Sequence, residues 1–181
     1  MRRRIFIAIN LPQDIKKQLV DYEKKWFDLP IRWTKFENLH ITLAFLGYIR
    51  EEELEEVSKI VKEVAEKSSV FKIVLNKICY GPFNNKETPK MVWATGEKSK
   101  EVVQLKKELD KRLGILENRE FKPHITLGRI RKWDWQRIDL EERPEIDEDI
   151  NFSFEVKSIE IMESHLKRGG PYYEVLMSVP F

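Results

Sequence analysis

Two stretches of the sequence contain the same tetrapeptide: Asn38-Leu39-His40-Ile41-Thr42-Leu43-Ala44-Phe45-Leu46-Gly47 and Lys122-Pro123-His124-Ile125-Thr126-Leu127-Gly128-Arg129. Each copy of His-Ile-Thr-Leu lies in a short, largely apolar run of the kind that predicts a β-strand. Successive side chains of a strand point to opposite faces. The histidine and threonine of each copy therefore share one polar face. The isoleucine and leucine share the other face, which we expect to be buried beneath helices.

The segments around the two tetrapeptides repeat one order of elements. In the first half, a strand at Ile5–Ile9 precedes a helix that opens at residues 11–14 and then the strand Leu39–Tyr48. In the second half, a strand at Met91–Thr95 precedes a helix capped by Ser99 and then the strand His124–Ile130. This repeat predicts two similar lobes related by a pseudo-twofold axis. Their polar faces then meet across one cleft.

The rest of the chain adds elements outside the repeat. The patterns predict a helix that begins at residues 51–53, strands at 70–80, 152–162 and 172–179, a hairpin turn at 169–171, and loops at 81–85 and 139–149. Strands mixed with a few helices indicate the α+β class. We expect a single domain over residues 1–181, bilobed, with two antiparallel sheets that form a central cleft and helices on the outer faces.

Composition excludes several classes of protein. Lys plus Arg is 33 and Asp plus Glu is 31, so the net charge is +2, unlike a histone-like nucleic-acid binder. Hydrophobic residues make up 41% of the chain, which is enough for a core. A single cysteine, Cys79, excludes an intramolecular disulfide. No apolar run approaches the length of a membrane span, and no signal peptide is visible, so we expect a cytoplasmic protein with no membrane partner.

Two histidines and two threonines on facing strands suit phosphoryl chemistry. A neutral imidazole accepts a proton from the attacking group, and a protonated imidazole donates one to the leaving oxygen. Threonine hydroxyls donate hydrogen bonds to phosphate oxygens. A shared zinc site is the rival interpretation, because histidine is a common ligand. Neither motif, however, has a neighbouring cysteine or carboxylate that completes a tetrahedral zinc site.

The paired motifs resemble the His-x-Thr-x motifs of the 2H phosphoesterase superfamily. The closer match is to its RNA 2′,3′-cyclic phosphodiesterases, also called 2′-5′ RNA ligases. Phe6-Ile7-Ala8-Ile9 and Glu163-Ser164 fit the same pattern, so the resemblance spans nearly the whole chain. It implies metal-independent opening of an RNA 2′,3′-cyclic phosphate to a 2′-phosphate, with no cofactor. RNA is the implied partner, tRNA halves included, and we expect a monomer.

The resemblance also implies a role for each motif residue. His40 is the implied proton donor and His124 the implied proton acceptor, while Thr42 and Thr126 hold the phosphate. The two motifs are nearly symmetric, so the reverse assignment of acid and base stays open. The family has an arginine at the place of Arg129, where it resembles a phosphate contact. Strict alternation points Arg129 away from His124 and Thr126, unless a bulge near Gly128 reorients it.

Several aromatic and cationic residues are candidates for the walls of the cleft. Stacking against bases and ordinary core packing are both open for each aromatic side chain. The candidates for binding the substrate are Arg32, Trp33, Tyr48, Phe83, Phe121 and Trp133, with Lys35 and other basic residues as a local positive field. His165 lacks a threonine partner and is interpreted as a surface histidine.

Two further functions remain alternatives. The same site run in reverse joins RNA ends through a 2′-5′ linkage, because a 5′-hydroxyl end takes the place of water. A non-catalytic protein that binds RNA ends is the other alternative. Substitution of either motif histidine separates enzyme from binder: an enzyme loses its rate, whereas a pure binder has no turnover to lose.

Overall fold

The computed structural model describes residues 2–82, 88–116 and 121–181; the predicted loop residues 83–85, and with them Phe83, lie outside these ranges. The helices and strands are β1 (Arg2–Asn10), α1 (Gln13–Glu23), β2 (Ile31–Trp33), β3 (His40–Arg50), α2 (Glu51–Ala65), β4 (Phe71–Gly81), β5 (Met91–Gly96), α3 (Lys100–Leu113), β6 (His124–Ile130), α4 (Lys132–Gln136), β7 (Asp147–Val156), β8 (Ser158–Lys167) and β9 (Gly170–Pro180). Among the described helices, none is both long enough and apolar enough to cross a membrane.

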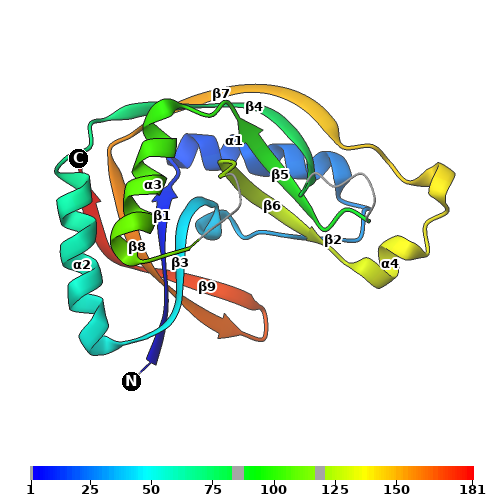
Figure 1. Ribbon diagram of the computed structural model, residues 1–181. Coiled ribbons are helices and arrows are strands. Elements are labelled where there is room, and N and C mark those ends of the chain that lie inside the picture. The colour runs from blue at the N-terminus through cyan, green and yellow to red at the C-terminus, as the bar shows by residue number, and fades with distance from the viewer. Residues whose placement is uncertain (1, 83–87, 117–120) are drawn as a thin grey trace.

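All strands join one antiparallel sheet in the order β7-β4-β5-β6-β3-β1-β8-β9, with β2 paired to β6 (Figure 1). The order is symmetric about its centre, since β5 and β6 of one half correspond to β1 and β3 of the other. The predicted repeat is therefore confirmed. The two halves join at β3 and β6 through the pair Ile41–Ile125, so the two expected antiparallel sheets form one continuous sheet.

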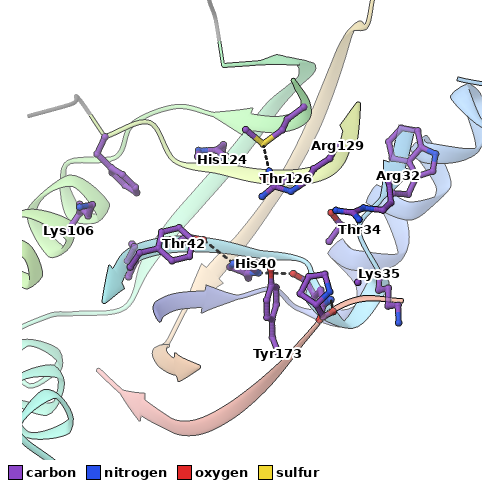
Figure 2. A pocket seen from close by; sticks show the side chains of 18 of the residues that line it. Arg32, Thr34, Lys35, His40, Thr42, Lys106, His124, Thr126, Arg129 and Tyr173 are labelled. Carbon is purple, nitrogen blue, oxygen red and sulfur yellow. Dashed lines mark hydrogen bonds between the residues drawn. The ribbon is translucent and has the colours of Figure 1, made fainter. Parts of the chain in front are cut away.

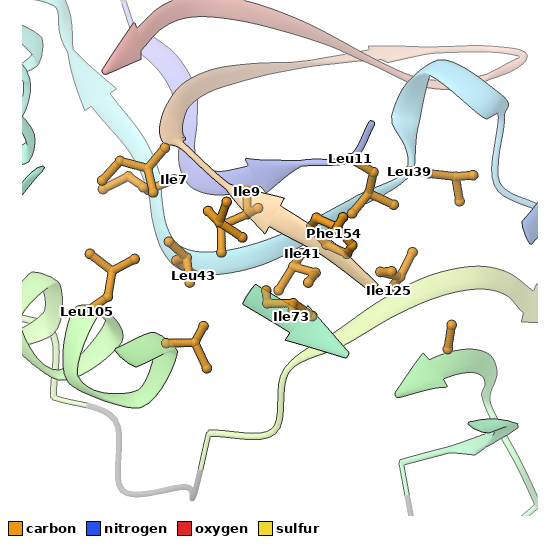
Figure 3. Close-up of a cluster of buried hydrophobic side chains, with 14 of the residues drawn as sticks. Ile7, Ile9, Leu11, Leu39, Ile41, Leu43, Ile73, Leu105, Ile125 and Phe154 are labelled. Carbon is orange, nitrogen blue, oxygen red and sulfur yellow. The ribbon is translucent and has the colours of Figure 1, made fainter. Parts of the chain in front are cut away.

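The core lies between the sheet and its helices (Figure 3). Ile41, Leu43, Ile125 and Leu127 are each at most 1% exposed, as the alternation of the two motifs predicts. Helices α1, α2 and α3 each contribute one apolar face, and α2 packs against α3. The buried residues of these faces are Ile15, Leu19, Val57, Val61, Val64, Val102, Leu105 and Leu109. Burial of each large aliphatic side chain contributes about 1.5–3 kcal/mol.

The helix and turn signals of the second half are mostly confirmed. The Ser99 hydroxyl accepts a hydrogen bond from the Val102 N–H at 3.1 Å, which caps α3 as predicted. Gly114 ends that helix with a left-handed φ of 66°. The predicted hairpin is formed by β8 and β9. The two shortest elements named above are not predicted from the sequence. Strand β2 has three residues and helix α4 has five, which is too few to show a hydrophobic period.

Two boundaries differ from the sequence expectation. The predicted strand at 152–162 is two strands that separate at Lys157: β7 pairs with β4, whereas β8 pairs with β1 and β9. No glycine or proline marks this break, so the apolar pattern runs through it. The acidic residues 147–149 belong to β7 rather than to a loop. There, Asp147 lies opposite Cys79 at the edge of the sheet, and its carboxylate is 2.8 Å from the Lys77 ammonium.

Candidate active site

The polar faces of the two motifs line one cleft of about 640 Å³ (Figure 2). Its walls come from β2, β3 and β6, from α3 and the residues that follow it, and from the β8–β9 turn. The pair Ile41–Ile125 sets the arrangement of the histidine and threonine side chains of the two motifs. Because the strands are antiparallel, His40 stands opposite Thr126 and Thr42 opposite His124. The structure thus brings together the four motif residues that the sequence singled out.

His40 is held by its own strand. Its Nδ1 lies 2.7 Å from the Asn38 carbonyl oxygen. A carbonyl only accepts, so Nδ1 carries the proton and donates it. In the neutral ring, Nε2 is then an acceptor, and it lies 2.9 Å from the Thr42 hydroxyl. The ring packs against Phe6 and Tyr173, with centroids 5.1 and 5.2 Å away.

Burial lowers the pKa of His40 to about 4, and the positive charges of Lys16 and His124 act in the same direction. The hydrogen bond to the Asn38 carbonyl opposes this shift. His40 is therefore neutral near pH 7 in the empty cleft, with Nε2 free of a proton.

His124 repeats this arrangement in the second lobe. Its Nδ1 donates to the Lys122 carbonyl oxygen at 2.8 Å, again two residues before the histidine. Its ring stacks on Trp93, with centroids 4.0 Å apart. Burial lowers its pKa below the ordinary value, and the Lys122 carbonyl opposes the shift. In both lobes, the Nδ1 proton is fixed by a backbone carbonyl, so Nε2 of the neutral ring carries no proton.

A β-bulge decides where Arg129 points. Two successive residues of β5 pair with Thr126 and Gly128, which leaves Leu127 without a partner. Leu127 and Gly128 are both buried. The alternation therefore skips one residue, and Arg129 lines the same cleft as Thr126. This is the reorientation that the sequence left open.

The first motif has the same bulge. Two successive residues of β1 pair with Thr42 and Ala44, which leaves the buried Leu43 without a partner. Phe45 then lines the cleft with 65% of its surface exposed. Phe45 and Arg129, each five residues after a motif histidine, are thus structural counterparts. The pseudo-twofold site carries an aromatic ring at one of these places and a guanidinium at the other.

The two ends of the cleft differ in chemistry. Arg32, Lys35 and Arg129 lie at the β2 end, and Lys106 lies at the α3 end, with the motif histidines between them (Figure 2). The Lys106 ammonium pairs with Asp110 and lies 5.8 Å from the centroid of the Phe121 ring. Apolar side chains complete the α3 end: Phe45, Ile115 and Leu116.

The predicted wall residues divide into two groups. Trp33 and Phe121 line the cleft, although Trp33 also stacks on Trp26. Tyr48 does not line it, and that prediction is corrected here. A second register shift between Phe45 and Gly47, where Gly47 has φ 71°, places Tyr48 beyond the cleft with 61% of its surface exposed. Phe45, Lys106 and Tyr173 also line the cleft, and the sequence does not predict them there. The apolar or cationic character of these side chains does not distinguish them from core or surface residues.

His165 lies outside the cleft. Its Nε2 is 2.9 Å from a Glu174 carboxylate oxygen, and Glu163 lies close by. The three side chains offer ligand atoms within 4.8 Å of one another. The Arg3 guanidinium, however, donates to Glu163 at 2.8 Å and supplies the positive charge there. The cluster is an ion-pair network between β1, β8 and β9.

The sequence model of the 2′-5′ RNA ligase superfamily matches residues 13–168. The chain belongs to this superfamily. The family resemblance is therefore confirmed over residues 13–168.

Two relatives and two solved structures match this chain over nearly their whole length. An RNA 2′,3′-cyclic phosphodiesterase of Methanocaldococcus jannaschii is 34% identical, and the match covers 96% of this chain and 98% of that protein. One of Thermotoga maritima is 29% identical, covering 98% and 95%. The crystal structure of TT0787 of Thermus thermophilus matches with a TM-score of 0.83 at 26% identity, covering 98% and 97%. Escherichia coli LigT complexed with 3′-AMP matches with a TM-score of 0.79 at 26% identity, covering 100% and 99%.

Proposed function

We propose that this protein hydrolyses RNA 2′,3′-cyclic phosphate ends to 2′-phosphates, with the two motif histidines as acid and base. The observation that carries the proposal is the paired geometry of the cleft. Each histidine donates Nδ1–H to a carbonyl of its own strand, so each Nε2 is the atom free to exchange a proton. The names of the relatives from M. jannaschii and T. maritima support the same reaction.

The chemistry follows from two imidazoles on opposite sides of a bound phosphate. His124 Nε2 accepts a proton from water as the water oxygen bonds to phosphorus. The bond from phosphorus to the 3′ oxygen breaks, and protonated His40 donates its Nε2 proton to that oxygen. The product carries a 2′-phosphate and a 3′-hydroxyl. Thr42 and Thr126 donate hydrogen bonds to the non-bridging oxygens, and Arg129 stabilises their negative charge.

The acid role requires His40 to gain a proton when substrate binds. An anion within about 4–6 Å of an imidazole favours the protonated form. The phosphate therefore raises the pKa of His40 from its low value of about 4 in the empty cleft. Protonation also reverses the contact with Thr42: Nε2 becomes a donor, and the threonine hydroxyl is released to donate to the phosphate.

Ligation is the second candidate function. A 5′-hydroxyl RNA end takes the place of water: His124 accepts the proton of that hydroxyl as its oxygen bonds to phosphorus. The bond from phosphorus to the 3′ oxygen breaks, His40 protonates that oxygen, and a 2′-5′ linkage results. The superfamily description favours this reaction. tRNA halves, which carry a cyclic phosphate on one fragment and a 5′-hydroxyl on the other, are the proposed RNA for this direction.

The test of the proposal is a product assay. Purified protein is incubated with EDTA and a short RNA that ends in a 2′,3′-cyclic phosphate, and the position of the product phosphate is identified. We expect a 2′-phosphate and no 3′-phosphate. The absence of turnover, or turnover only after a metal is added, would contradict the proposal. RNA binding without turnover would favour a protein that only binds RNA ends.

A further inference from the structure

We infer that Arg32 determines specificity: with Arg129, it binds the phosphodiester on the 5′ side of the terminal nucleotide. This inference rests on the proposed function. It adds a second phosphate subsite beside the one that holds the cyclic phosphate, and Arg129 is shared between the two subsites. Its consequence is that the protein prefers an oligonucleotide end to an isolated nucleoside 2′,3′-cyclic phosphate.

Strand β2 places Arg32 directly opposite Arg129 of β6. The two residues are direct partners in the antiparallel pairing of β2 with β6, and both line the cleft. Directly opposite residues share a face, with Cα atoms about 4.5–5.5 Å apart. The register is held on both sides of Arg32, since Thr34 N–H donates to the Leu127 carbonyl at 2.7 Å and Arg131 N–H donates to the Pro30 carbonyl at 2.8 Å.

Among the described residues, the two guanidinium groups have no carboxylate partner. Within the described ranges, neither Arg32 nor Arg129 forms an ion pair, whereas Arg3, Arg50 and Arg112 each pair with a glutamate. The contact of Arg129 is to the Met91 sulfur at 3.5 Å. Like charges directly opposite each other in a sheet destabilise it. A bound anion relieves this repulsion, and guanidinium groups bind phosphate oxygens with two parallel hydrogen bonds.

Gly128 makes room for this strand. A Cβ at this position would lie 2.4 Å from Cγ2 of Ile31 and 2.9 Å from Cε3 of Trp33. Because residue 128 has no side chain, Ile31 and Trp33, the neighbours of Arg32 in β2, pack closely against β6. The counterpart of Gly128 in the first motif is Ala44, which precedes Phe45 rather than an arginine. The guanidinium pair is a feature of the second lobe.

The distribution of charge between the two ends of the cleft indicates the direction in which the RNA lies. The α3 end is lined by Phe45, Phe121 and Ile115, and the cation there, Lys106, is paired with Asp110. The neighbouring hollow between α2 and α3 contains Glu53 and Glu56, and its arginine, Arg112, is paired with Glu63. The β2 end carries Arg32, Arg129 and Lys35. A cyclic phosphate at the histidines therefore places the next phosphodiester toward β2.

The test compares three substrates: adenosine 2′,3′-cyclic phosphate, the dinucleotide ApA 2′,3′-cyclic phosphate, and the same dinucleotide with an uncharged methylphosphonate linkage. We expect kcat/KM of the wild-type protein for the charged dinucleotide to exceed the other two values by about five- to tenfold, mainly through KM. Arg32→Gln should bring this ratio close to one, and Arg32→Lys should retain most of it. Arg131→Gln is the matched control, because Arg131 is exposed, lies 3.4 Å from an Asp134 carboxylate oxygen and does not line the cleft.

Salt dependence gives a second readout. The slope of log kcat/KM against log salt for the charged dinucleotide should become shallower by about one unit in Arg32→Gln. A wild-type protein that opens all three substrates equally well overturns the inference and leaves the proposed function standing. The same conclusion follows if Arg32→Gln leaves the kcat/KM preference for the charged dinucleotide unchanged. A wild-type protein that opens none of them overturns the proposed function and the inference together.

Discussion

Ile41 of β3 is paired with Ile125 of β6, and within the described residues this is the one pairing that joins the two central strands. It places His40 opposite Thr126 and Thr42 opposite His124 in a single register. Beyond it, β6 pairs with β2 instead, so the central strands diverge. The cleft therefore opens beside the pair of residues that aligns the motif histidines and threonines.

A sulfur leaving group will identify the general acid. A substrate whose 3′ oxygen is replaced by sulfur expels a thiolate, which does not require protonation. We expect this substrate to restore most of the rate of His40→Ala and little of the rate of His124→Ala. The measurement is the ratio of rates on the sulfur and oxygen substrates for each variant. Restoration in His124→Ala alone would reverse the two roles.

Phe45 will act on substrate binding. Its ring is 65% exposed within the cleft, and stacking of a base on an aromatic ring contributes about 1–3 kcal/mol. Phe45→Ala should raise KM for the RNA substrate about tenfold and change kcat little. Tyr48→Ala is the matched control, since Tyr48 is similarly exposed but lies outside the cleft. Equal effects of the two substitutions would argue against a base on Phe45.

We predict that Gly128→Ala weakens the packing of β2 against β6. The added methyl group collides with Ile31 and Trp33, and overpacking of this kind costs about 1–3 kcal/mol. We expect a lower free energy of unfolding in urea and a smaller preference for the charged dinucleotide. Gly169→Ala serves as the control for stability, because a Cβ there meets nothing within 4 Å. A Gly128→Ala protein as stable as the wild type would show that β2 does not need this space.

Glu23 will make stability depend on pH. Burial raises the pKa of Glu23 to about 8, and its Oε1 has no hydrogen-bond partner among the described residues. The native state then binds more protons than the unfolded state between about pH 4.5 and 8. Stability from this group is present below pH 4.5 and is lost as the pH rises through 8.

His40 has the opposite sign, because its pKa is lowered to about 4. The stability that His40 contributes is lost as the pH falls from 6.5 toward 4. Between about pH 4.5 and 6.5, the effects of Glu23 and His40 on the free energy of unfolding therefore oppose each other. The clean window for Glu23 is therefore pH 6.5–8. In that window, urea unfolding should show a free energy that falls with rising pH by up to about 1.4 kcal/mol per unit. Glu23→Gln should flatten this slope, and an equal slope in the variant would contradict the assignment.

Hydrophobic periodicity and the repeated tetrapeptide predicted the strand–helix–strand units, because each element buries one regular face. The same alternation placed the histidines and threonines on one polar face. It failed at Arg129 and Tyr48, where register shifts change the side to which the chain points. A bulge depends on pairing with a neighbouring strand, so the local sequence does not reveal it. The break at Lys157 is hidden for a similar reason. The apolar pattern continues through Lys157, whereas the strand before it, β7, pairs with β4 and the strand after it, β8, pairs with β1.

The most direct test of the central claim is the rate of cyclic phosphate opening, in EDTA, for His40→Ala, His124→Ala and His165→Ala. His165 serves as the matched control, because it is the remaining histidine and lies outside the cleft. We predict that each motif variant loses about 10²–10⁴-fold in rate and that His165→Ala retains the wild-type rate. Wild-type turnover in either motif variant, or an equal loss in His165→Ala, would contradict the two-histidine mechanism.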